Sequence, residues 1–282
     1  MHKVGGQAVI EGVMMRSDKK MAIAVRNPKG KIIVKSEKLN LLSERMKKWI
    51  FIRGVVNLVE IIAHGVKSLN YSADIAMGED KKEGKSNWFL FMALFIISIG
   101  FALLIFKFFP LLVARLINPR SNIIFNLIDG GVKLFVFIAY VYVISLMKDV
   151  KEVFRYHGAE HKAVACYEAK EKLTVKNARK YSTKHPRCGT SFIMIVIIIS
   201  IIVYVFLIPR NVPFSYNLLY RILLLPVIAG IAYEVLKISA KYEKNFFFHW
   251  FDKPGIWIQH LTTKEPNDKQ LEVALAALKK VV

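Results

Sequence analysis

Four stretches of the chain are almost continuously apolar, and polar segments separate them. They are Trp88–Phe109, Ile123–Leu146, Phe192–Ile208 and Leu219–Ser239. A helix needs roughly 20 apolar residues to cross the hydrocarbon core of a bilayer. The third stretch is short but uncharged, and the first two carry Lys107 and Lys133, which we expect to snorkel toward the membrane surface. The pattern predicts a mainly α, polytopic membrane protein with about four transmembrane helices.

The segment before the first span predicts a small β element. Ala22–Arg26 and Ile32–Lys35 alternate or run apolar on either side of the turn sequence Asn27–Gly30, as expected for a hairpin. Glycines interrupt the preceding apolar run, Gly5–Arg16. Such glycines mark bulges or tight packing more often than an anion-binding loop.

One long helix is predicted over Ser43–Ala76, with Ser43 as its N-cap. Its middle part, Trp49–Val66, is apolar enough to resemble a span, but Arg53 and Glu60 interrupt it. A fifth span would also put the lysine-rich N-terminal segment on the opposite side from the other basic segments. We therefore expect an interfacial or re-entrant helix that lies against the bundle.

The distribution of Lys and Arg predicts the orientation of the spans. Seventeen precede the first span, 11 lie in the middle loop and 7 follow the fourth span, whereas the two remaining loops hold two and one. By the positive-inside rule, both termini and the middle loop face the cytoplasm, here of the bacterial inner membrane. The net charge of +21 should attract anionic membrane lipids. A ribosome or a protein-insertion complex would suit the same charge, although the sequence carries no specific nucleic-acid motif.

These features divide the chain into five parts. They are a cytosolic β hairpin and interfacial helix (1–86), transmembrane helices 1 and 2 (87–147), a cytosolic metal-binding loop (148–191), transmembrane helices 3 and 4 (192–239), and a cytosolic tail with an amphipathic helix (240–282).

The middle loop contains the sequence Tyr156–His161. In a helix, His157 and His161 leave the same face one turn apart, so one divalent ion could bridge them. Glu160 completes the order His-x-x-Glu-His of the inverted zinc peptidases, in which the carboxylate polarises water. The stretch therefore predicts a metal site with Glu160 as a candidate catalytic residue.

A second pair of ligand types follows in the same loop. His185 and Cys188 flank a Pro-Arg turn that ends in glycine, and this spacing is typical of a metal knuckle. The predicted ligands are thus His157, His161, His185 and Cys188, with zinc or another divalent metal as the cofactor. In the cytoplasm, Cys188 and Cys166 should be reduced thiols.

The number of ligands decides the role of such a metal. Four protein ligands would close a tetrahedron and make a structural staple, whereas three would leave a position open for hydrolysis. Cys166 and Glu168 are spare ligands. Glu234, inside the fourth span, could ligate the metal, hold a histidine or pair with Lys237.

The tail combines membrane-facing and amphipathic parts. The aromatic run from Phe246 to Trp257 suggests anchoring in the headgroup layer, and Thr262–Pro266 resembles an exposed turn. Asn267 should then cap a helix over Asp268–Val281, with Gln270 completing a capping box. Its apolar stripe is Leu271, Ala274, Leu275, Leu278 and Val281. This face needs a partner, and the cytosolic domain is the obvious one.

The chain resembles the YqhQ-like family of bacterial inner-membrane proteins. The matching stretches are Gly5–Arg16, Tyr156–His161, His185–Phe192 and Leu261–Pro266. The similarity runs through nearly the whole chain. It implies a metal-dependent membrane enzyme but no established substrate.

Two functions of different class follow from the residues. The first is a zinc-dependent hydrolase at the cytosolic membrane face, in which Glu160 activates water and Arg187 or Lys162 holds an anionic substrate. The second is a non-enzymatic module, stapled by zinc, that docks a ribosome, a protein-insertion complex or anionic lipid. Glu160 favours the enzyme, because a closed staple needs no such carboxylate.

Overall fold

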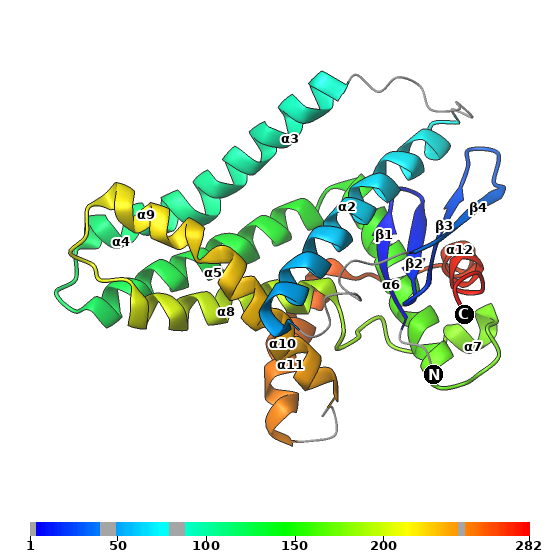
Figure 1. Cartoon of the computed structure of the whole chain (residues 1–282). Helices are drawn as coiled ribbons and strands as arrows, with labels where there is room; N and C mark the ends of the chain where they lie inside the picture. The colour runs from blue at the N-terminus through cyan, green and yellow to red at the C-terminus, as the bar shows by residue number, and fades with distance from the viewer. Residues whose placement is uncertain (1–3, 40–48, 79–87, 242–245) are drawn as a thin grey trace.

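The computed structural model describes residues 4–39, 49–78, 88–241 and 246–282, and four of its helical stretches are long and apolar enough to cross a membrane (Figure 1). The first consists of α3 (Trp88–Leu103), the π-helical turn η1 (Leu104–Phe108) and α4 (Phe109–Ile117); the second is α5 (Asn122–Ser145); the third is α8 (Gly189–Leu207); the fourth joins α9 (Phe214–Leu223) to α10 (Leu225–Lys241). The prediction of a mainly α membrane protein with four spans is confirmed.

The first and fourth spans are longer than predicted. The first continues past Phe109 to Ile117, because Pro110 occupies the first turn of α4, where its missing N–H is tolerated. The fourth begins at Phe214, directly after Pro213.

Lys107 and Lys133 differ from the prediction. They do not snorkel to a membrane surface; each is buried, with 8% and 4% of its surface exposed. Lys107 donates to the hydroxyl of Tyr204, and Lys133 pairs with Asp129. The expectation was wrong because both lysines lie on helix faces that point at neighbouring spans, which hydropathy alone does not reveal.

The long helix α2 (Ile50–Ala76) lies between the N-terminal sheet and α10 (Figure 1). The predicted cap at Ser43 falls outside the described residues. Arg53 of α2 makes a bidentate ion pair with Glu234 of α10, with N–O distances of 2.9 and 2.7 Å. Glu234 therefore has an arginine partner that the sequence pattern did not indicate.

The N-terminal segment forms a four-stranded antiparallel sheet with strand order β1-β2-β3-β4. The strands are β1 (Gly5–Val9), β2 (Gly12–Arg16), β3 (Lys20–Arg26) and β4 (Ile32–Lys38). The predicted turn joins β3 to β4, with Gly30 at a φ of 80°. Gly6 and Gly12 serve tight packing, because an added Cβ would lie 2.6 Å from the carbonyl of Met14 and 2.3 Å from that of Ala24.

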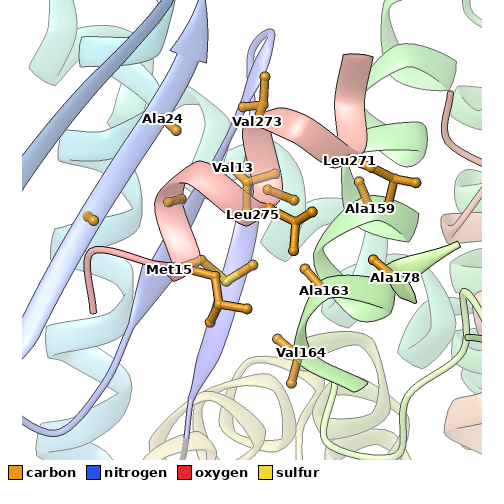
Figure 2. Close-up of a cluster of buried hydrophobic side chains, with 14 of the residues drawn as sticks. Val13, Met15, Ala24, Ala159, Ala163, Val164, Ala178, Leu271, Val273 and Leu275 are labelled. Atoms are coloured by element: carbon orange, nitrogen blue, oxygen red, sulfur yellow. The ribbon is translucent and has the colours of Figure 1, made fainter. Parts of the chain in front are cut away.

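The two faces of the sheet pack against different helices, because side chains alternate along a strand. Val13 and Met15 point toward α6 (Lys148–Glu168) and α12 (Asp268–Leu278), where they share a core with Leu271 and Leu275 (Figure 2). Met14 lies on the opposite face, in the cluster that packs against the C-terminal half of α2. We call β1–β4, α6, α12 and the short α7 (Val175–Ala178) the sheet domain.

The predicted helix in the tail is confirmed. Asn267 caps α12, and Gln270 completes the capping box. Its apolar stripe is buried against the sheet and α6. Before it, α11 (Phe246–Thr262) packs against α8, while the side chains of the aromatic run from Phe246 to Phe251 lie outside the described residues.

Candidate metal centre

Helix α6 carries two of the predicted ligands on one face. His157 and His161 are four residues apart, and their ring centroids are 4.4 Å from each other. Each side chain in a helix lies above the one a turn away, which explains this proximity. His161 is 3% exposed and His157 is half-buried, so both rings are held inside the protein.

Both imidazoles are oriented by backbone carbonyls. His157 donates from Nδ1 to the carbonyl of Thr262 at 2.8 Å, and His161 donates from Nδ1 to that of Thr183 at 2.6 Å. A carbonyl only accepts hydrogen bonds, so Nδ1 bears the proton and Nε2 keeps its lone pair when the ring is neutral. This arrangement is the one that metal-ligating histidines commonly have.

Cys188 completes a group of three. It caps the N-terminus of α8, and its Sγ lies 3.2 Å from His157 Nε2. His161 also hydrogen bonds to Cys188, and the ligand atoms of all three residues lie within 4.8 Å of one another. The first-turn N–H of Thr190 points at the sulfur, and a helix N-terminus favours negative charge there. The three side chains could hold one metal ion.

The fourth predicted ligand lies beside this group with its ring already hydrogen bonded. His185 accepts the N–H of Arg187 at Nδ1 (3.2 Å) and faces Glu168 with Nε2 (3.2 Å). Its ring centroid is 5.8 Å from that of His161. The backbone of His185 is clamped by Gln259, which accepts from its N–H and donates to its carbonyl. Three of the four predicted ligands thus lie close together, whereas the fourth, His185, points at Glu168.

Glu160 is buried next to the group, with 6% of its surface exposed. One carboxylate oxygen accepts the backbone N–H of Gly6 in β1, and a Cβ at that glycine would lie 2.9 Å from Oε1. The other oxygen, Oε2, has no hydrogen-bond partner in the described residues. Burial raises the pKa of Glu160, while His157, His185 and the Gly6 N–H oppose that rise.

Burial also lowers the pKa of the His161 imidazole, and the hydrogen bonds to Cys188 and Thr183 oppose this shift. The neutral ring is the form that ligates a metal. For His161, burial therefore favours the protonation state that metal binding requires.

The segment Thr262–Pro266 is not the exposed turn expected from its sequence. Thr262 and Thr263 are each 5% exposed. The Lys264 N–H donates to the carbonyl of Phe154 at 2.9 Å, and its own carbonyl lies directly over Gly158. Thr262, Thr263 and Pro266 are buried because the segment lies along α6, and the Thr262 carbonyl orients His157.

The residues proposed to hold an anionic substrate are already paired. Lys162 is 4% exposed and contacts Glu265 at 2.5 Å and the carbonyl of Arg179 at 3.1 Å. Arg187 pairs with Glu168. The spare thiol of Cys166 is fully buried, outside the group of three, with its pKa raised by burial.

Several residues that build the site gave no signal in the sequence. The carbonyls of Thr183 and Thr262 act through the backbone, so their side-chain types carry no information. Nothing in the sequence around Gln259 indicates that its side chain hydrogen bonds to the backbone of His185. Gly6 belongs to the glycine-punctuated N-terminal run, but only the structure brings it to Glu160.

Fold and site together define a polytopic membrane protein with a His₂Cys group, able to hold a metal ion, where α6 of the sheet domain meets the start of the third span. The chain belongs to the family described as "Protein of unknown function (DUF1385)", whose model matches residues 49–282. It is 35% identical over 308 residues to the "Uncharacterized protein YqhQ" of Bacillus subtilis (strain 168), in an alignment that covers 100% of this chain and 94% of that protein. No solved structure matches the chain.

Proposed function

We propose that this protein is a metal-dependent hydrolase that works at the cytosolic face of the bacterial cytoplasmic membrane, with zinc as the metal. The observation that carries the proposal is the convergence of His157 Nε2, His161 and Cys188 Sγ. The buried Glu160 interacts electrostatically with His157, and its Oε2 has no hydrogen-bond partner among the described residues. Three protein ligands are typical of catalytic zinc, which keeps a position open for water or substrate.

Each residue of the site has a distinct task in this proposal. His157, His161 and Cys188 would hold the ion, and the carbonyls of Thr262 and Thr183 keep the imidazoles in the ligating tautomer. When bound, the ion supplies Lewis-acid activation of water and of the scissile carbonyl or phosphoryl group. Glu160 would accept a proton from the attacking water at Oε2, while the Gly6 N–H donates a hydrogen bond to Oε1 and holds the carboxylate in place.

The location of the site favours a membrane substrate. Cys188 stands at the start of the third span, and Gln259, one turn before the end of α11, holds the neighbouring His185. A lipid-linked molecule or a membrane peptide would present its scissile bond at this level of the bilayer. The basic segments, placed in the cytoplasm by the positive-inside rule, favour an anionic substrate.

The test compares Glu160→Gln with Cys188→Ala in full-length protein purified in detergent. We expect about one zinc per chain in the wild type and in Glu160→Gln, by elemental analysis, and a strong loss in Cys188→Ala. Native membrane extract incubated with each protein and analysed by mass spectrometry should then show products only with the wild type. Products from Glu160→Gln at the wild-type rate would refute hydrolysis through this residue, and wild-type protein without metal would refute the whole proposal.

The burial of the ligands favours one alternative. His161 and Cys188 are 3% and 5% exposed, and they join α6 of the sheet domain to the start of a span, as a structural staple would. In that case the protein is a non-enzymatic module that docks a ribosome, a protein-insertion complex or anionic lipid. X-ray absorption of the zinc-loaded protein decides between the two: an additional oxygen ligand from water supports the enzyme, and a closed set of protein ligands supports the staple.

A further inference from the structure

All four spans meet in a buried polar cluster that the proposed metal centre does not use. Its ionisable members are Lys107 of η1, Asp129 and Lys133 of α5, Tyr204 of α8 and Arg221 of α9. None is more than 8% exposed. Ionisable groups at this depth are costly and mark functional sites in membrane proteins.

Arg221 is fully committed to fixed partners. It donates to Asp129 Oδ2, to Asn126 Oδ1 at 2.6 Å and to Asn217 Oδ1 at 2.7 Å. Its guanidinium also lies 4.6 Å from the ring centroid of Tyr204. These contacts hold the second and fourth spans together, so a structural role accounts for Arg221.

The structural contacts of Lys107 and Lys133 are fewer and do not explain why these two charged groups are buried. Lys133 donates to Asp129 Oδ2 at 3.2 Å, and Lys107 donates to the Tyr204 hydroxyl at 3.0 Å. Both ammonium groups lie beside the same tyrosine ring, 4.9 and 5.3 Å from its centroid. An ammonium has three N–H donors, and each lysine uses one of them on a side chain of the described residues.

The cluster is unbalanced in charge. In the described part of the chain, Asp129 is the sole carboxylate that pairs with Lys133 and Arg221, and Lys107 makes no ion pair. Three formal positive charges thus surround one negative charge in a region of low dielectric. Buried cations without a counter-charge are strongly destabilising, so an additional anion would stabilise the cluster.

Asp129 shows what kind of anion fits. Its Oδ2 accepts from Arg221 and Lys133, but Oδ1 is buried without any hydrogen-bond partner in the described residues. The cluster therefore has unused donors on the lysines and an unused acceptor on Asp129. Chloride or sulfate would satisfy the donors and leave Oδ1 unpaired. An oxyanion that carries a proton satisfies both, because its hydroxyl donates and its other oxygens accept.

The backbone around Lys107 is a second, independent feature. Residues Leu104–Phe108 form a π-helical turn inside an otherwise α-helical span. Such turns are rare and are frequent at functional sites. This turn contains Lys107, which makes no ion pair with any of the described residues.

We propose that this cluster binds a protonated oxyanion of the hydrogenphosphate type, held by Lys107, Lys133 and Asp129. The same chemistry is found in a free ion and in a lipid headgroup. Asp129 and Arg221 each lie seven residues inside their helices, which is about 10 Å from the end distal to the sheet domain. A headgroup phosphate stays at the membrane surface, so the depth favours a free ion.

Thermal unfolding of the full-length protein in detergent, without added phospholipid, tests the proposal with inorganic phosphate as the probe. Near neutral pH and at constant ionic strength, phosphate should raise the midpoint temperature saturably. Sulfate, which has the same shape but no proton, should bind about a hundredfold more weakly. Sulfate as effective as phosphate would overturn the assignment of a protonated ion. A response that appears only when phospholipid is added would overturn the free ion.

Variants locate the effect. Lys107→Met should abolish the phosphate response, whereas Lys148→Met, a matched change at an exposed lysine outside the cluster, should preserve it. Asp129→Asn should remove the preference for phosphate over sulfate, because an amide can donate to either ion. If these variants do not fold, equilibrium dialysis of wild-type protein with radiolabelled phosphate, competed by sulfate, measures the same binding directly. Absence of saturable binding there, or an unchanged response in Lys107→Met, would refute the proposal.

Discussion

Gly158→Ala should disturb the metal centre without touching a ligand. Gly158 follows His157 in α6, and a Cβ at this position would lie 2.1 Å from the carbonyl oxygen of Lys264 and 3.2 Å from Thr183. A carbon and a carbonyl oxygen approach to roughly 3.3 Å at closest. The backbone at Lys264 must therefore move by about 1 Å.

That movement reaches the imidazole through a short path. The Lys264 N–H is hydrogen bonded to the carbonyl of Phe154, so the segment cannot simply swing away from α6. Two residues earlier, the Thr262 carbonyl accepts the hydrogen bond from His157 Nδ1 at 2.8 Å. Displacing this carbonyl removes the contact that fixes the ring and its tautomer.

The expected magnitudes follow from these contacts. Overpacking a rigid site typically costs about 1–3 kcal/mol. The better helix propensity of alanine returns at most about 1 kcal/mol. With that full return, the net loss in the free energy of unfolding is at most about 2 kcal/mol. Losing an outer hydrogen bond to a metal ligand typically weakens metal affinity about 10–100-fold.

Two measurements check this, with Gly189→Ala as the matched control. Gly189 directly follows Cys188, but a Cβ there would meet nothing within 4 Å. The control should keep wild-type metal affinity, measured by competition with a chelator of known strength, and wild-type thermal stability. If Gly158→Ala also binds metal with unchanged affinity, the reasoning that places His157 under the control of the Thr262 carbonyl is wrong.

Two further predictions concern the membrane part. Arg53→Ala breaks the bidentate ion pair with Glu234 and should lower the free energy of unfolding by about 1–3 kcal/mol. Adding Glu234→Ala should lower it little further, which a double-mutant cycle by thermal unfolding measures. Additive losses in this cycle would contradict the prediction. Gly130→Ala should destabilise by about 1–3 kcal/mol because its Cβ would lie 2.3 Å from Ile201 Cγ1. The same change should cost clearly less in an Ile201→Ala background, and an equal cost would show that another contact limits the space.

The elements of the fold could largely be predicted from the sequence, because their signals are local. Long apolar runs indicated the four spans, and the capping box at Asn267 indicated the start of α12. The turn at Gly30 indicated one hairpin of the sheet. Boundaries were harder to predict: the first span was expected to end at Phe109, but the helix continues through Pro110 to Ile117.

The candidate site could be predicted only in part. The four-residue spacing of His157 and His161 is a local signal, and it brought both rings to one face as expected. The pairing of His185 with Glu168 and Arg187 is decided by how a loop folds back on the end of α6. Spacing cannot distinguish a histidine that points at a metal from one that points at a carboxylate.

Long-range pairings were the least predictable feature. Glu234 was expected to act at the metal or to pair with Lys237, and it pairs instead with Arg53, which precedes it by 181 residues. Lys107 and Lys133 were expected at a membrane surface, and they meet Tyr204 and Asp129 inside the bundle. In each case the helix was predicted correctly, but its rotation relative to its neighbours was not.

Because the sheet and α12 share one core, the sheet domain can be completed only after the whole chain has been synthesised. The strands precede the four spans in the chain, whereas α12 follows them all, so Val13 and Met15 have no complete partner surface until translation has passed Leu275. One face of the nascent sheet therefore stays uncovered until all four spans have been made. Completion of the domain thereby reports that insertion is finished, and a chain that stalls midway leaves an apolar face open to chaperones and proteases.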